Sequence, residues 1–482
     1  AIPSVGPKTA KLLYEKLGVD SVEKLESLAK AGKLLGLPGI REKKQEDILK
    51  GIEVWKRGQE RMPLGKALPL AHAIIGRLKA LPFVKEIEMA GSVRRMKETI
   101  GDVDILVTSS NPRKVMEAFV KLPQVQEVLA HGETKSSVRH VEGIQVDLRV
   151  VEPEVFGAAL QYFTGSKQHN IRFRDIASRK GLKVSEYGVF NEKTGKRIAG
   201  RTEEEVYEAV GLPYIPPELR EDVGEIEAAQ EGTLPKLLTL SDIKGDLHAH
   251  TNWSDGNHPL EALVEAAYRK GYEYIIVSDH SKSSTVAGGL SAERLLEQVA
   301  KIRELQKKYK NFRILAGCEC DILADGRMDF PDEVLAQLDI VLAAIHSRFK
   351  QSKEEMTKRI VTALKGPYVN ILAHPTGRLI GERASYEVDL EAVFAQAKAE
   401  GKAVEINASP QRLDLNDLSA RRAKAMGVLI AISTDTHFLT HLDNMQLGVA
   451  MARRAWLERK DVVNAMPLKK LLQWAHRKRP KG

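Results

Sequence analysis

The sequence predicts a multidomain protein of α/β and α+β units, and three observations lead to this fold class. At 482 residues the chain is too long for one compact core. Apolar residues recur at helical spacing in its first part, whereas β-rich runs set among helices begin near Arg61. Beyond Asp242 short apolar strands alternate with amphipathic helices, which is typical of a parallel sheet or a β/α barrel.

These changes of pattern divide the chain into five segments. They are a small helical domain at 1–60, an α/β or α+β unit at 61–152, a mixed stretch at 153–217, an acidic linker at 218–241 and a β/α unit at 242–482. In the second segment we expect strands at 103–108 and 144–151. In the last we expect strands at 274–278, 312–316, 340–344, 369–373, 404–407 and 428–433.

Composition restricts the compartment and the partner. The 74 basic against 65 acidic residues give a net charge of +9, which suits a polyanion but also describes many other proteins. Two cysteines, Cys318 and Cys320, exclude a disulfide framework and favour the reducing cytoplasm. No apolar run approaches the roughly 20 residues of a membrane span, so we expect no membrane partner. Because Ala1 opens directly into a Pro and Gly turn pattern, we also expect that preceding sequence is missing.

A first group of candidate catalytic residues lies in GSVRRMKETIGDVDILV. Asp102 and Asp104 are two residues apart on a predicted strand, so both carboxylates project from one face. A third carboxylate, Asp147 in GIQVDLRVV, lies on another apolar strand that can sit beside the first. An Asp-x-Asp by itself is more often a loop or a solvated edge. Three carboxylates so placed can hold the two cations that phosphoryl or nucleotidyl transfer needs.

Upstream, Gly91 and Ser92 offer a tight turn whose backbone N–H groups can hold phosphate, with Arg94 and Arg95 nearby for charge. The whole segment resembles the nucleotidyltransferase palm of family X DNA polymerases, whose GS and G-D-x-D pattern it matches. The resemblance implies a Mg²⁺-dependent site in which Asp102, Asp104 and Asp147 are catalytic.

The resemblance extends to YFTGSKQHNIRFRDIASRKG, which starts at Tyr162. It implies that Tyr162 and Phe163 exclude a ribose 2′ oxygen, that Asn170 contacts the base edge and that Arg174 reads the template side. Arg61 aligns by chain order with a triphosphate-binding Arg. The implied nucleotide-binding residues are Arg61, Gly91, Ser92, Arg95, Tyr162, Phe163, Thr164, Gly165, Asn170 and Arg174. An aromatic pair in a core, followed by a basic helix, is the alternative.

Two turns, in PSVGPKTA and LPGIREKK, resemble helix-hairpin-helix units that bind DNA phosphate through the N–H groups of a helix N-terminus. We therefore expect Gly6, Lys8 and Gly39 to contact DNA, although ordinary helix punctuation also explains the second turn. Ser4 stands where the family has its leading Gly, and Gln145 where several members carry an Arg that orients the carboxylates. We expect the family's N-terminal 8 kDa domain, which carries any lyase lysine, to be missing from this sequence, and we assign no lyase activity to it.

The C-terminal unit carries a second group, because nine of the 13 histidines follow Asp242. Imidazole together with carboxylate suits Zn and Mn, and a His-x-His at a strand end directs both rings toward one ion. The candidate ligands at the predicted strand ends are His248, His250, Asp255, His280, Glu319, His346, His374, Asp435 and His437. Cys318 and Cys320, beside Glu319, are either soft ligands or, as their alternation favours, packed core.

This second series resembles the polymerase and histidinol phosphatase (PHP) family, a distorted, TIM-like β/α barrel that holds three metal ions. Carried over position by position, all nine ligand places are filled, and Glu319 bridges two ions. The resemblance implies hydrolysis of a phosphoester, with up to three Mn²⁺ or Zn²⁺ ions activating water and neutralising the phosphate.

Both resemblances together imply a bacterial-type family X DNA polymerase with helix-hairpin-helix fingers at 1–60, a palm at 61–152, a small thumb at 153–217 and a PHP barrel at 242–482. We expect a cytoplasmic monomer that fills gaps during DNA repair, including base excision repair. Its substrates would be gapped or primer-template DNA and dNTP, and its barrel would supply 3′–5′ exonuclease or 3′-end-cleaning activity. The alternatives are a small-molecule phosphatase of the histidinol phosphate kind and a DNA-binding scaffold with a silent polymerase site.

Overall fold

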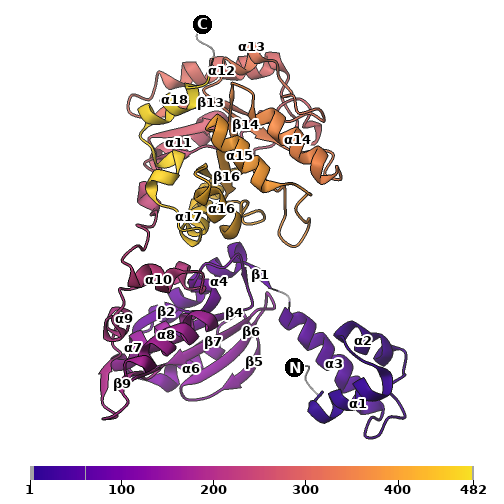
Figure 1. The fold of residues 1–482 in the computed structure, drawn as a ribbon, viewed down its shortest axis with the longest axis vertical. Helices are drawn as coiled ribbons and strands as arrows, with labels where there is room; N and C mark the ends of the chain where they lie inside the picture. Colours follow the sequence, from indigo (N-terminus) through magenta and orange to yellow (C-terminus); the bar gives the residue numbers. More distant parts are fainter. Residues whose placement is uncertain (1–4, 60, 480–482) are drawn as a thin grey trace.

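Residues 5–59 and 61–479 are described by this computed structural model, and Figure 1 shows them as a helical unit, a body built around small sheets and a β/α barrel. The helical unit lies to one side of the central body in that view, and the barrel lies beyond the central body's other end. The predicted multidomain fold class is confirmed. Within the described residues, none of the helices combines the length and the apolar character that a membrane crossing requires.

The helical unit consists of α1 (Pro7–Leu17), α2 (Val22–Lys30) and α3 (Glu42–Gln59). Ser21 caps α2, because its hydroxyl accepts a hydrogen bond from the Lys24 backbone N–H at 3.2 Å. Gly18 ends α1 in the left-handed conformation at φ 61°. The apolar residues at helical spacing meet in one core, made of Leu13, Leu25, Ala29, Leu34, Ile40, Ile48 and Ile52. The unit therefore has a core of its own.

A five-stranded sheet of order β2-β4-β7-β6-β5 forms the palm. Its strands are β2 (Val84–Met89), β4 (Asp102–Ser109), β5 (Val125–His131), β6 (Lys135–His140) and β7 (Gln145–Val150). A pair of short strands, β1 (Met62–Pro63) and β3 (Thr99–Ile100), and the helices α4 (Leu64–Lys79), α5 (Gly91–Arg94) and α6 (Pro112–Val120) complete it. The β4–β7 pair is parallel, unlike the other three pairs, and its register sets Asp104 opposite Asp147.

The thumb packs around a small core that contains Phe173 and Tyr207. Its elements are α7 (Phe156–Thr164), α8 (Lys167–Arg179), β8 (Leu182–Ser185), β9 (Gly188–Asn191), β10 (Arg197–Ala199) and α9 (Glu203–Val210). The segment expected as a linker is folded, because α10 (Glu225–Gln230) contributes Ile226 and Ala229 to the same core.

Seven parallel strands form the barrel, each next to its neighbour in the chain. They are β11 (Gly245–Asp246), β12 (Tyr274–Val277), β13 (Arg313–Asp321), β14 (Ile340–Ala344), β15 (Val369–Leu372), β16 (Ala403–Asn407) and β17 (Leu429–Ser433). The helices are α11 (Leu260–Arg269), α12 (Ala292–Gln306), α13 (Asp332–Leu335), α14 (Lys353–Leu364), α15 (Leu390–Glu400), α16 (Asp417–Ala425), α17 (Met445–Arg454) and α18 (Leu468–His476). A parallel bridge between Ala249 and Thr436 joins the first edge of the sheet to the last.

One buried carboxylate ties the thumb to the palm. Glu203 at the start of α9 accepts from Arg94 of α5 and from Arg220, both at 2.6 Å. Arg94 also donates to the Thr164 hydroxyl at 2.7 Å. The Arg220 side chain is fully buried, so Glu203 is the charge that makes its burial tolerable. Burial alone would raise the pKa of Glu203, but the two guanidinium groups outweigh it and hold that pKa below its usual value.

Glu203→Gln should destabilise the thumb by about 3 kcal/mol at neutral pH, because a buried guanidinium loses its counter-charge. Since the folded-state pKa of Glu203 is depressed, its stabilisation is present above the unfolded pKa and is lost as pH falls through the folded pKa. Hydrogen exchange of α8 and α9 amides, measured from pH 7 to about pH 4, reports the thumb alone.

The exposed Glu204 on the same helix gives the matched control, and Glu204→Gln should leave exchange unchanged. Equal protection in the Glu203 and Glu204 variants at pH 7 would contradict this role for Glu203.

Candidate active sites

The palm brings three predicted carboxylates together at the β4–β7 pair. Asp104 and Asp147 are register partners, and Asp102 lies two residues before Asp104 on the same strand. Burial, and then the charges of Asp102 and Asp147, raise the pKa of Asp104 to about 7. Burial and the charge of Asp147 also raise the pKa of Asp102. Carboxylates that repel one another in this way fit a divalent cation, which would relieve the repulsion.

The turn before the carboxylates requires glycine. Gly91 has φ +61°, and a Cβ added to it would lie 2.4 Å from Asp104 Oδ2. The Ala90 backbone N–H donates to the Asp104 carbonyl at 2.8 Å, which fixes the turn against β4. The backbone N–H groups that start α5 are therefore held beside the carboxylates, where phosphate can bind them.

Most of the predicted nucleotide-binding residues line one pocket of about 440 Å³. Its lining consists of Arg61, Gly91, Ser92, Arg95, Asp102, Asp104, Tyr162, Phe163, Gly165, Lys167, Asn170 and Arg174. Asp147 and Thr164 are outside this lining. Thr164 instead lies behind the lining residue Arg95, whose Nη1 donates to the Thr164 carbonyl at 2.5 Å. Arg61 is held by its Nε, which donates to the Thr99 hydroxyl at 2.9 Å.

The aromatic pair lines the pocket and is half-buried, and Phe163 also packs against a small apolar cluster that contains Phe156 and Leu160. The Tyr162 and Phe163 rings meet edge to face with centroids 5.2 Å apart. Arg149 lies over the Phe163 ring at 4.4 Å. Asn170 donates through Nδ2 to the Tyr162 carbonyl at 2.8 Å, and its backbone carbonyl accepts from Arg174 at 3.2 Å. These contacts fix the pocket wall before any ligand binds.

Sequence reasoning missed two basic residues beside the carboxylates. Lys135 on β6 places Nζ 3.8 Å from Asp147 Oδ2, and Lys167 lines the pocket. Gln145, noted for replacing an Arg, donates through Nε2 to Asp147 Oδ1 at 2.9 Å and so still orients that carboxylate. Lys135 lies on a strand that no pattern indicated, and the β6–β7 register, which pairs Lys135 with Arg149 and Ser137 with Asp147, makes it a diagonal neighbour of Asp147.

The predicted DNA-contacting residues of the helical unit lie at helix starts. Gly6 precedes α1 as its N-cap residue, and Gly39, at φ +78°, lies in the turn before α3. The side chain of Lys8 is outside the described part of the structure, as is the whole of Ser4. DNA contact by Gly6, Lys8 and Gly39 stays a prediction.

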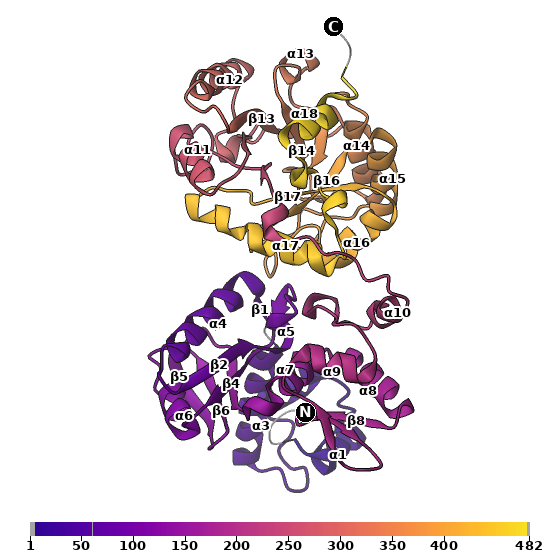
Figure 2. The ribbon, with the colours of Figure 1, turned by 90° about the vertical axis from the view of Figure 1, so that its left-hand side faces the viewer.

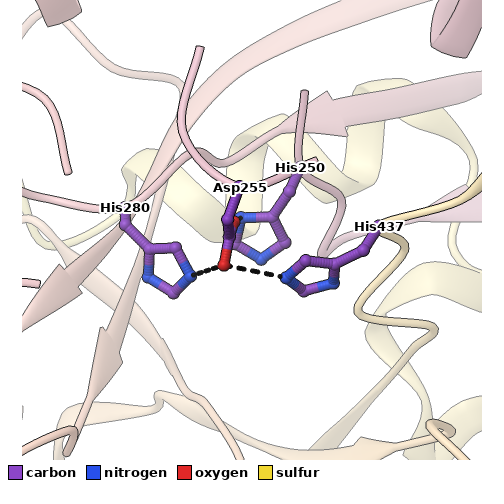
Figure 3. Close-up of side chains that lie close together, drawn as sticks. All are labelled: His250, Asp255, His280 and His437. Atoms are coloured by element: carbon purple, nitrogen blue, oxygen red, sulfur yellow. Dashed lines mark ion pairs between the residues drawn. The ribbon is translucent and has the colours of Figure 1, made fainter. Parts of the chain in front are cut away.

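In the barrel, all nine predicted ligands gather where the parallel strands end. Their side chains form three overlapping groups able to hold a cation: His250, Asp255, His280 and His437; His248, His250 and Asp435; and His280, Glu319 and His346. His374 joins the third group, since its Nε2 lies 2.7 Å from Glu319 Oε1. Figure 3 shows the Asp255 carboxylate between the rings of His280 and His437, at 3.4 and 3.3 Å, with His250 behind it.

Glu319 is the centre of this arrangement. Its carboxylate is 1% exposed and meets five imidazoles, at 3.3 Å from His248, 3.6 Å from His250, 3.0 Å from His280, 3.2 Å from His346 and 2.7 Å from His374. Burial would raise the pKa of Glu319, but the imidazoles, His346 first, hold it well below its usual value. Burial lowers the pKa of His280, yet Glu319 and Asp255 outweigh it and raise that pKa to about 10. Cation binding must displace such protons.

Two buried acids that were not predicted orient the rings. Glu405 on β16 contacts His248 Nδ1 at 2.8 Å and accepts from the His374 backbone N–H at 2.7 Å. Asp321 contacts His346 Nδ1 at 2.6 Å. Each acid leaves the other ring nitrogen facing Glu319, as carboxylates behind metal-bound imidazoles do. Glu405 could have been suspected from the sequence, because it is a charged residue within an otherwise apolar strand.

The hydrogen bonding of the histidine ring nitrogens shows whether these residues suit metal ions. Among the described residues, buried nitrogens without a hydrogen-bond partner include His248 Nε2, His250 Nδ1 and Nε2, His280 Nδ1 and His374 Nδ1. Four of these five nitrogens face a carboxylate at 3.0 to 3.7 Å without forming a hydrogen bond, and bound cations between the rings and the carboxylates would satisfy both. The donor set of imidazole and carboxylate therefore fits Mn²⁺ or Zn²⁺.

A pocket of about 480 Å³ opens over these ligands, and its lining includes one positively charged side chain that was not predicted from the sequence. Arg412 lines it, with Nε 3.3 Å from Asp435 Oδ2, and within the described chain its buried Nη1 has no hydrogen-bond partner. Cys318 and Cys320 are buried in an apolar cluster, which confirms their expected place in the core. No candidate metal group of the described residues includes His258 or His441.

Comparison with protein families assigns three parts of the chain. Residues 1–53 match the SAM-like helix-hairpin-helix tandem, 159–221 the DNA polymerase beta thumb, and 246–409 the PHP domain. The matched segments coincide with the helical unit, the thumb and most of the barrel described above.

Individual relatives cover both halves of the molecule. A probable phosphatase of Thermoanaerobacter sp. is 30% identical over 45% of this chain and 89% of its own length. Leishmania infantum polymerase beta, in a ternary primer-template complex, matches with 24% identity and a TM-score of 0.35, over 46% of this chain and 95% of that one. The DNA polymerase/3′-5′ exonuclease PolX of Bacillus subtilis is 43% identical over 97% of this chain and 82% of its own length. The chain therefore belongs to the PolX family, the family X DNA polymerases that carry a C-terminal PHP domain.

Proposed function

We propose that the chain carries out two reactions on DNA ends: template-directed extension of a primer in the palm and removal of 3′-terminal nucleotides in the barrel. The observation that carries this proposal is the presence of two separate clusters on one chain, carboxylates beside a basic pocket in the palm and histidines with carboxylates in the barrel. The Bacillus subtilis relative is named for the same pair of activities. Gap filling during DNA repair, base excision repair included, by a cytoplasmic monomer is the setting we propose.

In the palm, we infer that Asp102, Asp104 and Asp147 hold Mg²⁺, because hard carboxylate oxygens suit it. Bound there, Mg²⁺ would neutralise the triphosphate and favour ionisation of the primer 3′ hydroxyl. The N–H groups of the Gly91–Ser92 turn, Arg61 and Arg95 would bind the triphosphate. Lys135 from the neighbouring strand β6 and Gln145 from the same strand β7 contact the Asp147 carboxylate.

The rest of the pocket would select the nucleotide. Tyr162 and Phe163 form a wall stiffened by Arg149, and this wall would exclude a ribose 2′ oxygen. Asn170, held by the Tyr162 carbonyl, would contact the base edge, and Arg174 the template side. Thr164 and Gly165 form the turn that closes the pocket against Arg95. The helix starts at Gly6 and Gly39, with Lys8, would hold the duplex by its phosphates.

In the barrel, we infer that up to three Mn²⁺ or Zn²⁺ ions are held by the nine gathered side chains. Such ions would activate water and neutralise a phosphodiester at neutral pH. Glu405 and Asp321 would keep His248 and His346 in the ring orientation that binding needs. The unpaired guanidinium nitrogen of Arg412 would bind a phosphate oxygen of the DNA end.

A second candidate for the barrel is hydrolysis of a small phosphomonoester, since relatives of this half are named probable phosphatases. Assaying histidinol phosphate beside a 3′-recessed duplex separates the two. Faster turnover of the duplex end supports the nuclease.

Replacing Asp102 and Asp104 together by Ala should abolish primer extension, by at least about a thousandfold, because the cation loses two of its three ligands. Hydrolysis of a 3′ end should keep its wild-type rate. Both rates are read from primer length on a gel with a gapped duplex, with and without deoxynucleotides. Equal loss of both activities would refute two separate sites.

Gly91→Ala should reduce primer extension by about a hundredfold or more, because the new methyl group displaces the Asp104 carboxylate and strains the turn. Gly76→Ala, at a position with nothing within 4 Å of the added Cβ, is the matched control. Extension at the same rate by the two variants would exclude a role for the Gly91 turn.

His346→Ala and His374→Ala should each abolish shortening of the primer in Mn²⁺ while primer extension continues, since each removes an imidazole from the Glu319 cluster. Replacing the neighbouring His441, which belongs to no candidate group of the described residues, by Ala should leave shortening intact. Undiminished shortening in both cluster variants would place hydrolysis elsewhere.

A further inference from the structure

The palm packs directly against a loop of the barrel that reaches the hydrolytic pocket. Gly65, in the first turn of α4, lies so close to this loop, at 409–413, that an added Cβ would be 2.2 Å from Pro410 Cβ. Leu64 and Leu413 belong to one contiguous apolar cluster that spans palm and barrel. Figure 2 shows the barrel resting on the palm along this side, with α4 directly beneath it.

A charged contact lies beside this apolar one. Arg378 Nη2 is 2.7 Å from Glu98 Oε2 of the palm, and the two side chains are 14% and 32% exposed. The same guanidinium donates to the Arg412 carbonyl at 2.9 Å and to the Leu413 carbonyl at 2.5 Å. Glu98 is fixed in turn, because its own carbonyl accepts from the Leu64 backbone N–H at 2.9 Å. One arginine thus joins the palm to the backbone of the barrel loop.

The other side of that loop is the hydrolytic pocket. Arg412 extends into it and contacts the predicted ligand Asp435. The backbone around Arg412 has little freedom, since Leu413 is held at φ +41° and the Asp414 carboxylate accepts from the Thr376 N–H at 3.0 Å. A shift of the loop away from the palm would therefore move the Arg412 guanidinium within the pocket.

We propose that the palm is a working part of the hydrolytic site: Gly65 and Glu98, the latter through Arg378, position Arg412 to bind a phosphate of the DNA end. Arg378 is a positioning residue, because it holds the Arg412 loop and does not reach the pocket itself. The inference rests on the proposed hydrolysis. It makes exonuclease action by the barrel depend on the polymerase palm, although no palm side chain touches a barrel ligand candidate among the described contacts.

The test compares Gly65→Ala and Glu98→Gln with Gly76→Ala, a control on α4 whose new methyl group meets nothing. Gly65→Ala pushes Pro410, and Glu98→Gln removes the charge that Arg378 meets. Each should raise KM for 3′-end hydrolysis about tenfold, with kcat changed less than about threefold, because a charged phosphate contact is weakened. Unchanged melting temperatures show that the variants fold, and Gly65→Ala should extend primers at the wild-type rate.

A double-mutant cycle separates positioning from general loosening. With Arg412 already replaced by Ala, neither Gly65→Ala nor Glu98→Gln should raise KM further. Effects that add to that of Arg412→Ala would overturn the proposal, as would palm variants that behave like Gly76→Ala while His346→Ala still abolishes hydrolysis. A wild-type chain that shortens no primer would instead overturn the hydrolytic function and this inference together.

Discussion

Buried carboxylates that need positive partners shape both halves of this molecule. In an interior of low dielectric constant an unpaired carboxylate is costly, and Glu203 and Glu319 are each surrounded by guanidinium or imidazole groups. Glu203 holds two arginines and thereby joins thumb to palm, and Glu319 is encircled by five imidazoles at the mouth of the barrel. Burial and then mutual repulsion with Asp147 raise the pKa values of the palm carboxylates Asp102 and Asp104, so cations suit that site.

The strands that hold the candidate catalytic and metal-binding residues could be predicted, because each is marked by a short sequence pattern of its own. Strands were expected at 103–108 and 144–151, and β4 (Asp102–Ser109) and β7 (Gln145–Val150) are found there. All six strands expected in the barrel are present, and the nine candidate ligands at their ends lie together. In a parallel barrel, adjacency in sequence becomes adjacency in space, so strand-end residues converge without further information.

The rest depended on information that no local pattern holds. β11 (Gly245–Asp246) is too short to show a periodicity, and the edge strand β5 (Val125–His131) is almost entirely exposed. Lys135, Glu405 and Arg412 contact partners on other elements of the fold, so only their placement in the fold reveals them. The acidic residues after 217 read as a linker by composition, yet the apolar Ile226 and Ala229 among them pack into the thumb.

The bridge that closes the barrel has a consequence for its mechanics. The first and last strands meet around Ala249 and Thr436, where the His250 N–H donates to the Thr436 carbonyl at 2.8 Å and the Thr436 N–H to the His248 carbonyl at 3.3 Å. Beside this bridge the Thr434 N–H donates to Asp246 Oδ1 at 3.1 Å. His248 and His250 flank this seam on one edge, and Asp435 and His437 flank it on the other. An ion bound by both His250 and Asp435, which lie 3.2 Å apart, would link the two edges of the barrel and stabilise its closure. Loss of the ion would then loosen this end of the barrel, while the Asp246–Thr434 contact and the other strand pairs stayed in place.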